Sequence, residues 1–454
     1  MTAILDAIHH TAEKLGAQGI QPGMRVGFRL PNQAAFAVTA AACWRIGAVP
    51  VPLSTRYTHY QTQTALKDMK CRSVILDKHA MREFSIPVLR LDRICHYNAC
   101  TFGGVFWDDL NLTMEQEATM VLTSGSMGRP KGILHTFANH YYSALGSHER
   151  IPFVREDVWL VSLPLYHMGG LSLIARSLLH GGTLRFPQED WQTDLVKHRV
   201  THISLVPTQL RQLLSTPETC QALEKLKVVL VGGAPCPADL VKRAVDLQIP
   251  IHSTYGLTEM ASQVTTTAPG EAAECPGGCG QVLSHRELCM ARDGEILVKG
   301  RTLCKAIVFG DKTFDPLDGE DWLRTGDLGS LDTQGRLTVW GRKDAMFISG
   351  GENIQPEEIE QALLQLPEVE QCLVVPIPDD RYGQRPVAFL RPVSSKRMNR
   401  SELLEAVLVL ERFKRPDHFF YWPAEAPNTF KPDRAWFATH ALCSIRSNRT
   451  DQFI

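Results

Sequence analysis

The chain has 454 residues, which is more than one hydrophobic core usually organises, so we expect two or three domains. Lys and Arg number 48 against 49 Asp and Glu, and this near balance gives no electrostatic basis for binding nucleic acid or an anionic membrane surface. No apolar stretch approaches the length needed to span a bilayer.

The first predicted element is an amphipathic helix over residues 1–19. It mixes acidic and basic side chains and lacks the basic end and apolar middle of a secretory signal peptide. We therefore expect a cytoplasmic protein.

Strands and helices then alternate as far as about residue 283. Strands rich in Val, Ile and Leu are predicted at 25–31, 48–53, 73–77, 159–165, 201–207, 227–233 and 251–256, with helices at 34–47, 171–180 and 237–248. Apolar strands that alternate with helices indicate an α/β fold whose parallel sheets are covered on both faces. Ligands on such sheets usually bind beyond the carboxyl ends of the strands.

The pattern changes after residue 283. Short strands bounded by turns, at 294–300, 335–342 and 345–351, are typical of a small barrel or an antiparallel sheet. A new α+β unit follows, with a helix at 354–366 and strands at 372–379 and 385–393. We place a domain boundary near Asp344, which predicts a large domain over 1–343 and a small domain over 344–454.

The twelve cysteines are scattered along the chain, most of them in apolar runs, and are interpreted as reduced and buried. Cys275 and Cys279 are close in sequence. No second pair and no histidine accompanies them, which argues against a structural zinc site because such a site needs four ligands.

Residues 123–132, "TSGSMGRPKG", have the composition of a phosphate-binding loop. The stretch combines hydroxyl groups, flexible glycines and one ammonium group, and its candidate ligands are Thr123, Ser124, Gly125, Ser126, Gly128 and Lys131. A flexible surface turn is the alternative interpretation. A Walker A motif is excluded, because Pro130 stands where the second glycine is required.

Candidate nucleotide-binding residues recur later in the chain. Tyr255 could stack on adenine, and Glu259 beside Thr258 could hold Mg²⁺ against phosphate oxygens; the alternative is a strand-end turn with an exposed glutamate. Asp327, which we expect at the end of a strand, has two oxygens that suit a ribose diol, and the Arg342 guanidinium could reach the same ribose or a phosphate. Backbone at Gly232, Gly233, Ala234 and Gly256 could approach a flat ring closely.

The loop at 123–132 resembles the signature loop of the adenylate-forming enzymes, which include acyl- and aryl-CoA ligases, luciferases and peptide-synthetase adenylation domains. Met127 replaces the second threonine of the usual loop. With the later segments, the resemblance runs from about residue 20 to residue 435. It implies ATP, Mg²⁺ and coenzyme A as cofactors, a metal-binding role for Glu259, and contacts of the matching residues with AMP.

The resemblance also implies roles for the end of the chain. Lys431, in "APNTFKPDR", matches the lysine that contacts the reacting carboxylate and the α-phosphate, although Phe430 replaces the usual glycine; Lys414 is the rival candidate. Asp344 matches a hinge about which the small domain moves. Gly350 and Gly351 match a loop that closes over the second active site.

The acyl pocket is expected from residues 162–182 and 201–210. His167 is a pocket-wall residue by resemblance or a structural histidine, and Ser204 is a polar neighbour. Arg176 lies in an apolar helix, so its guanidinium either reaches solvent or pairs with an anion such as a second substrate carboxylate. These segments look most like those of family members that join o-succinylbenzoate, an aromatic dicarboxylic acid, to coenzyme A in menaquinone biosynthesis.

Three other functions stay open at this point. The chain could be another aryl- or acyl-CoA ligase, a stand-alone adenylation enzyme that loads a carrier protein, or a nucleotide-binding relative without activity. The sequence does not specify an oligomeric state, and a homodimer stays open. Relative to the family, the chain is expected to lack the strand-rich segment that usually comes first.

Overall fold

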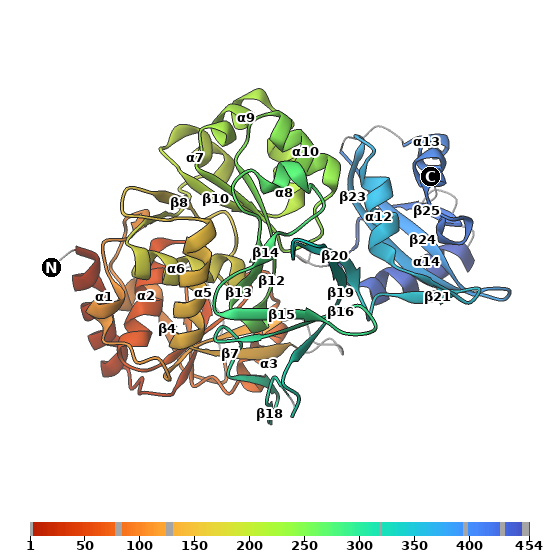
Figure 1. Cartoon of the computed structure of the whole chain (residues 1–454). Helices are drawn as coiled ribbons and strands as arrows, with labels where there is room; N and C mark the ends of the chain where they lie inside the picture. The colour runs from red at the N-terminus through yellow and green to blue at the C-terminus, as the bar shows by residue number, and fades with distance from the viewer. Residues whose placement is uncertain are drawn as a thin grey trace.

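The structure is a computed structural model that describes residues 3–77, 84–123, 130–317, 319–393, 398–426, 432–446 and 454. A large N-terminal domain and a smaller C-terminal domain lie side by side (Figure 1). Within the described residues, no helix combines the length and the apolar character that crossing a membrane requires.

The first part of the large domain is a parallel sheet of four strands in the order β2-β1-β3-β4. Its elements are α1 (Ala3–Ala17), β1 (Arg25–Arg29), α2 (Ala34–Arg45), β2 (Val49–Pro52), α3 (His59–Asp68), β3 (Ser73–Leu76), β4 (Val88–Arg90) and α4 (Leu91–Ile94). All residues of β2 and β3 are buried, and so are eleven of the twelve residues of α2. The continuous apolar runs of the sequence are therefore explained by burial on both faces.

The second sheet has eight strands in the order β14-β13-β12-β11-β10-β8-β9-β5. These strands are β5 (Thr101–Phe102), β8 (Val158–Leu160), β9 (Thr183–Arg185), β10 (His202–Leu205), β11 (Val228–Val231), β12 (Ile251–Leu257), β13 (Ser262–Thr266) and β14 (Gln281–Val282). The middle of the sheet is parallel as predicted, whereas β13, β14 and β5 are added antiparallel at the two edges. The sheet is thus mixed.

Helices and turns surround this sheet. They are η1 (Trp107–Leu110), α5 (Phe137–Arg150), α6 (Met168–His180), α7 (Trp191–Lys197), α8 (Pro207–Leu213), α9 (Pro217–Glu224), α10 (Ala238–Asp246), the 3-10 turn η2 (Thr258–Met260) and α11 (Glu271–Glu274). The ends of β11 and β12 carry five of the predicted site residues, Gly232, Gly233, Ala234, Thr258 and Glu259.

Antiparallel strands after residue 283 take part in two sheets, but the expected strand at 345–351 lies in neither: β21 (Phe347–Ser349) pairs with β22 (Glu352–Ile354) instead. One has the order β15-β16-β19-β20, with β15 (Arg286–Met290), β16 (Glu295–Gly300), β19 (Leu323–Leu331) and β20 (Leu337–Arg342). The other has the order β18-β17-β7-β6, with β6 (Glu117–Thr123), β7 (Lys131–Thr136), β17 (Ala306–Phe309) and β18 (Lys312–Phe314). The second sheet therefore joins the strands on both sides of the predicted phosphate loop to strands far along the chain.

The small domain is built on an antiparallel pair of long strands and a third strand parallel to one of them. Its elements are β21 (Phe347–Ser349), β22 (Glu352–Ile354), α12 (Pro356–Leu364), β23 (Val369–Asp379), β24 (Gly383–Pro392), α13 (Arg400–Ala406), η3 (Val407–Val409), η4 (Arg412–Lys414), β25 (His418–Tyr421) and α14 (Arg434–Arg446). Apolar clusters lie on both faces of this sheet, so the domain has a core of its own.

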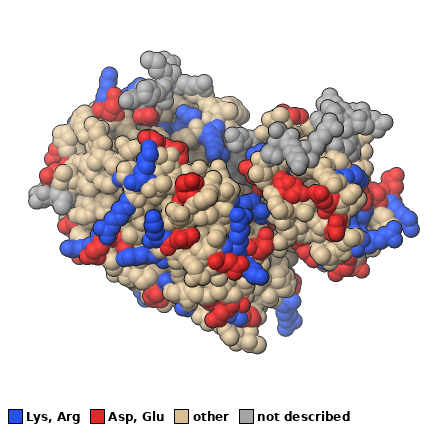
Figure 2. All heavy atoms as spheres, turned by 90° about the horizontal axis from the view of Figure 1, so that it is seen from above, with Lys and Arg blue, Asp and Glu red and all other residues tan. Residues whose placement is uncertain are grey.

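The two domains meet through polar groups on α8, α10 and the end of α12. Arg211 Nη2 donates to the carbonyl of Leu364 at 2.8 Å, and Gln365 Nε2 donates to Asp239 Oδ1 at 2.9 Å. Figure 2 shows basic and acidic side chains interspersed over both domains on the face seen from above.

Candidate active site

The predicted phosphate loop connects β6 and β7, which form an antiparallel hairpin. Thr123 and Lys131 are paired across the hairpin, so their side chains lie on the same face at the two ends of the loop. The Thr123 hydroxyl is buried and has no hydrogen-bond partner within the described residues. Ser124, Gly125, Ser126 and Gly128, with Met127, lie outside the described residues. A buried hydroxyl without a partner and a nearby ammonium group fit a phosphate oxygen.

Three residues that the sequence suggested separately lie in one hydrogen-bonded chain. The hydroxyl of Tyr255 donates to Asp327 Oδ2 at 2.6 Å, and Arg342 Nη1 donates to Asp327 Oδ1 at 3.1 Å. Arg342 also forms an ion pair with Asp344 at 3.0 Å. Burial and the Asp327 carboxylate raise the pKa of Tyr255 well above its usual range, so the phenol stays protonated.

The expectation that Asp327 ends a strand is wrong. Asp327 lies inside β19, which continues to Leu331 because β20 pairs with it along this length. Arg342 on β20 is the residue paired with Asp327, and this pairing brings the two side chains together across the sheet.

The predicted glycines lie where the backbone passes close to a neighbouring strand. A Cβ atom at Gly232 would lie 2.6 Å from Thr254 Cγ2, and one at Gly256 would lie 2.1 Å from the carbonyl oxygen of Ser262. Gly233 has a φ of +80°, and Ala234 follows it on the exposed loop after β11. The neighbouring strand therefore leaves no room for a side chain at Gly232 or Gly256, and this part of the candidate site is formed by backbone.

Thr258 and Glu259 form the start of η2. The Glu259 carboxylate is partly buried and makes no hydrogen bond or ion pair with the described residues. Among all the residues that the structure describes, there is no group of three or more His, Cys, Asp and Glu side chains that could hold a metal ion. Mg²⁺ usually binds through one or two carboxylates plus substrate phosphates and water, so a single free carboxylate fits this ion.

Arg176 is buried in α6, and this excludes the interpretation that it reaches solvent. It is 3% exposed, and Nη2 donates to Gln263 Oε1 at 2.5 Å. Its Nε and Nη1 atoms are buried without a partner within the described residues, and the guanidinium carbon lies 5.1 Å from the centre of the Trp159 ring. Burial lowers the pKa of Arg176 to about 10, which leaves it charged at neutral pH.

His167 and Ser204 lie at or near the ends of α6 and β10, and only Ser204 shares a neighbour, Trp159, with Arg176 among the described contacts. His167 is the residue before α6, and its ring is 4.7 Å from that of Tyr166. Ser204 is buried on β10, and its hydroxyl accepts a hydrogen bond from Trp159 Nε1 at 3.2 Å. Because Trp159 also faces the Arg176 guanidinium, Ser204 and Arg176 belong to one buried polar group.

Sequence reasoning missed Gln263 and Trp159. Gln263, on β13, is 2% exposed. Its side-chain oxygen accepts a hydrogen bond from Arg176, and its backbone carbonyl accepts one from Arg286. A glutamine in a run of buried Val and Thr was a usable signal for Gln263. No pattern distinguishes Trp159 from an ordinary core residue.

The end of the chain is described only in part. Lys431 and Phe430 lie outside the described residues. The rival, Lys414, is held by Glu358 and Glu411 at 2.9 Å each, which commits it to the small domain. Gly350 and Gly351 have φ values of +60° and +91°, and the Gly350 N–H donates to the carbonyl of Tyr382.

The cysteines are all free thiols. Five are buried (Cys43, Cys71, Cys95, Cys304 and Cys372), six are partly buried, and Cys443 is exposed. The prediction of reduced thiols fits this arrangement, whereas burial is less complete than expected.

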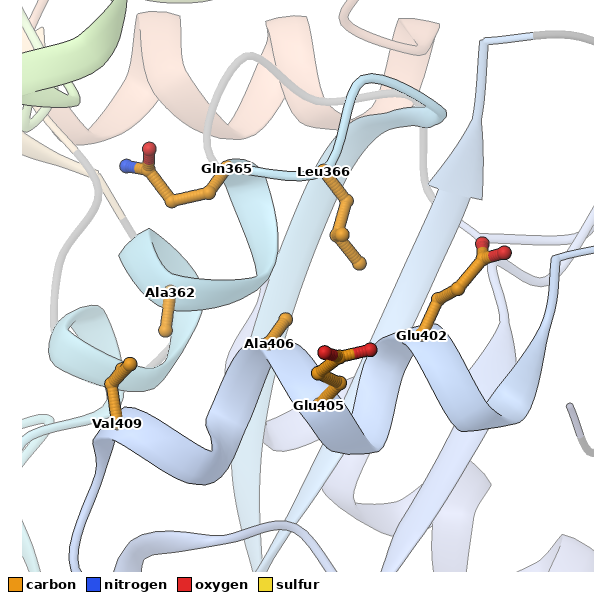
Figure 3. Close-up of a pocket in the computed structure, with 7 residues that line it drawn as sticks. All are labelled: Ala362, Gln365, Leu366, Glu402, Glu405, Ala406 and Val409. Atoms are coloured by element: carbon orange, nitrogen blue, oxygen red, sulfur yellow. The ribbon is translucent and has the colours of Figure 1, made fainter.

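A cavity of about 320 Å³ lies apart from these residues, between α12 and α13 of the small domain (Figure 3). Its walls combine apolar side chains, among them Leu366 and Val409, with the carboxylates Glu402 and Glu405. It contains no cationic or hydroxyl side chain that could bind a phosphate or a carboxylate. We therefore do not assign it to the candidate site.

Comparison with known proteins identifies the family of the chain. Residues 3–306 match the family described as AMP-binding enzyme, and residues 358–429 match the AMP-binding enzyme C-terminal domain. The 2-succinylbenzoate–CoA ligase of Bacillus pumilus (strain SAFR-032) is 32% identical over 451 residues, which cover 95% of this chain and 91% of that protein.

Solved structures give the same result. The o-succinylbenzoate CoA synthetase (MenE) of Bacillus subtilis, in complex with the acyl-adenylate intermediate OSB-AMP, superposes with a TM-score of 0.84 at 30% identity, covering 96% of this chain and 92% of that one. The same synthetase in complex with ATP and magnesium ion gives a TM-score of 0.79 at 30% identity, with 92% and 90% coverage. The chain belongs to the AMP-binding enzyme family.

Proposed function

We propose that the chain is an acid–thiol ligase that activates 2-succinylbenzoate with ATP and transfers the acyl group to coenzyme A, a step of menaquinone biosynthesis. Arg176 is the observation that carries the choice of acid. A buried cation with two nitrogens that have no partner within the described residues is costly unless an anion joins it, and a dicarboxylic acid brings one carboxylate for reaction and one for this pairing. The related Bacillus subtilis synthetase binds the adenylate of the same acid.

In the first half-reaction, a carboxylate oxygen of the acid attacks the α-phosphorus of ATP. The bond to the bridging oxygen of the β-phosphate breaks, pyrophosphate leaves, and an acyl-adenylate forms. Positioning and charge stabilisation supply most of the catalysis in such a displacement. Lys131 and the Thr123 hydroxyl bind the phosphates together with Ser124, Gly125, Ser126 and Gly128.

Mg²⁺, when bound at Glu259, neutralises charge on the phosphate oxygens. The related synthetase that binds ATP with magnesium ion supports this assignment. Thr258, beside Glu259, is assigned to the same phosphate region.

The nucleoside is assigned to the backbone and hydrogen-bonded groups beside these phosphates. Gly233 and Ala234 leave room for the adenine ring, which Tyr255 covers, and Asp327 binds the ribose hydroxyls with Arg342 as its partner. Asp327 accepts bonds from Tyr255 and Arg342, and these two partners fix the orientation of its carboxylate.

The acid is assigned to the region bounded by α6, β10 and β12. Arg176 binds the carboxylate that does not react. Trp159 connects Arg176 to Ser204, because its ring faces the guanidinium and its Nε1 donates to the Ser204 hydroxyl. His167, Gly232 and Gly256 complete the proposed wall.

In the second half-reaction, the thiol of coenzyme A attacks the acyl carbon and AMP leaves. We place the boundary of the two domains at Asp344, with domains over 1–343 and 344–454, and assign Lys431 to the first half-reaction. Rotation about Asp344 then withdraws Lys431 and brings the loop of Gly350 and Gly351 to the site.

Pyrophosphate release tests this proposal. The chain is incubated with ATP, Mg²⁺ and coenzyme A, and with 2-succinylbenzoate, benzoate, octanoate or cinnamate in turn, and the mass of each thioester is determined. Selective formation of the 2-succinylbenzoyl thioester is the expected result. If pyrophosphate is released with another acid, the proposed substrate is wrong but the proposed reaction stands. Formation of the adenylate without a thioester favours the loading of a carrier protein. If folded protein releases no pyrophosphate with any acid, the proposal is overturned.

A further inference from the structure

The turn that carries Glu259 has an unusual backbone. Ala261 and Ser262, directly after η2, have φ values of +51° and +112°, a region that residues with a side chain rarely adopt. Each such residue costs about 1–3 kcal/mol and persists only where the surrounding structure holds it. Something outside the turn must therefore fix its shape.

Three hydrogen bonds to successive parts of the turn do this. His135 Nε2 bonds the carbonyl of Thr258 at 2.8 Å, the N–H of Cys304 donates to the carbonyl of Glu259 at 2.7 Å, and the hydroxyl of Ser143 donates to the carbonyl of Ala261 at 2.7 Å. The backbone on both sides of the Glu259 side chain is thus fixed by neighbouring elements.

His135 is the donor that connects this turn to the phosphate loop. It is fully buried on β7, the strand that begins at Lys131, and side chains four residues apart on a strand share a face. Because a carbonyl oxygen only accepts, Nε2 carries the hydrogen, and Nδ1 is buried without a partner within the described residues. Burial lowers the pKa of His135 to about 4, so the ring is neutral at ordinary pH.

We propose that His135, assisted by Ser143, is a positioning residue that sets where the Glu259 carboxylate stands relative to Lys131 and the bound phosphates. This inference rests on the proposed role of Glu259 in binding Mg²⁺. It assigns a role in metal and nucleotide binding to a histidine that touches neither.

His140 provides a matched control. It is also a buried histidine, on α5, and its ring centre is 5.3 Å from that of His135. Its Nε2 pairs with the hydroxyl of Thr119 on β6 at 2.8 Å instead of with the turn. Replacing His140 therefore disturbs the same part of the core and leaves the Thr258 carbonyl bonded.

The experiment compares His135→Leu, which removes the donor, His135→Gln, which restores an N–H group, and His140→Leu. Binding of ATP is titrated by calorimetry at increasing Mg²⁺ without any acid, so no turnover occurs, and thermal unfolding is recorded for each variant. We expect His135→Leu to raise the half-saturating Mg²⁺ concentration about 10-fold, the usual effect of losing an outer partner of a metal ligand. We expect His135→Gln to recover most of this and His140→Leu to change it by less than about 2-fold.

Equal shifts in His135→Leu and His140→Leu, or no recovery in a folded His135→Gln, would overturn the inference. If His135→Leu does not fold, Ser143→Ala takes its place: an increased requirement for Mg²⁺ supports the inference, and an unchanged one overturns it. Glu259→Gln in the same titration separates the two proposals. If Glu259→Gln binds ATP and Mg²⁺ as the unaltered chain does, the proposed metal site itself is wrong.

Discussion

Arg176 and Arg286 are both buried arginines, but their hydrogen bonds differ. Arg286 donates to the carbonyls of Gln263, Ser284 and Ser143, so its guanidinium is well supplied with acceptors. Within the described residues, Arg176 has one hydrogen bond, to the side chain of Gln263. Burial, with a smaller contribution from the charge on Arg176, lowers the pKa of Arg286 to about 9. Two buried cations thus act in one region, and Arg176 is the one with N–H groups available for an anion.

This difference predicts opposite effects of Arg176→Met on stability and activity. Replacing a buried charge by an apolar side chain of similar size is often neutral or stabilising, so we expect an unchanged or raised melting temperature. Removing one partner of a buried charged pair costs about 2–5 kcal/mol, so kcat/KM for 2-succinylbenzoate should fall by two to three orders of magnitude. Thermal unfolding and steady-state kinetics measure the two effects.

A monocarboxylate analogue that keeps the reacting carboxyl group and lacks the other one is the control substrate. The analogue that lacks the carboxylate bound by Arg176 should lose less than about 3-fold in kcat/KM in the variant, because the missing charge pair was never formed. An equal loss with every acid would show that Arg176 acts on the common reaction instead of on the second carboxylate.

For single residues, the sequence identified candidates for the site but not the contacts between them, and their roles in the reaction stay predictions. Tyr255, Asp327 and Arg342 were each candidates, but the Tyr255–Asp327 bond spans 72 residues and no local pattern encodes it. Gln263 and His135 were missed because a buried polar residue becomes conspicuous only when its partners are known. Residues of the phosphate loop and Lys431 remain predictions, since they lie outside the described residues.

At the scale of elements, strands that are buried on both faces were predicted well, because their apolar runs are continuous. The hairpin of β6 and β7 and its pairing with β17 were not predicted. Ala306 of β17 pairs with Leu134 of β7, and long-range antiparallel pairing of this kind has no sequence signature. The same limit explains why β19 is longer than expected, since its length is set by pairing with β20.

The close pairing of β12 with β13 depends on Gly256. The register shifts between Tyr255 and Gly256, and the position of a Cβ atom there is 2.1 Å from the carbonyl oxygen of Ser262. We expect Gly256→Ala to push the strands apart and lower the free energy of unfolding by about 2–4 kcal/mol. Denaturant unfolding of the variant measures this. Gly277→Ala is the matched control, because no atom lies within 4 Å of a Cβ atom there; equal destabilisation by both would contradict the assignment.

At the scale of the whole molecule, the contact between the domains is suited to movement. Within the described residues, Arg211 donates to Leu364 and Gln365 to Asp239 away from the boundary, and Gln355 donates to the carbonyl of Arg342 beside it; all three contacts are polar and none is fully buried. Exchanging such polar contacts for hydrogen bonds to water costs little free energy. Each domain keeps its own apolar core when the two domains separate. We therefore expect the proposed rotation about Asp344 to cost little free energy.

A covalent lock tests this rotation. Asp239→Cys with Gln365→Cys, in a chain that also carries Cys443→Ser, places two thiols where the side chains now share a hydrogen bond of 2.9 Å. Oxidation should hold the domains in the observed arrangement, so that one half-reaction falls at least about 10-fold while the other is preserved, and dithiothreitol should restore both. Pyrophosphate release measures the first half-reaction, and thioester formation from supplied acyl-adenylate measures the second. The single-cysteine variants control for the substitutions themselves. If the locked protein, with its disulfide verified by mass, performs both half-reactions at the unlocked rates, chemistry at a single domain arrangement replaces the rotation about Asp344.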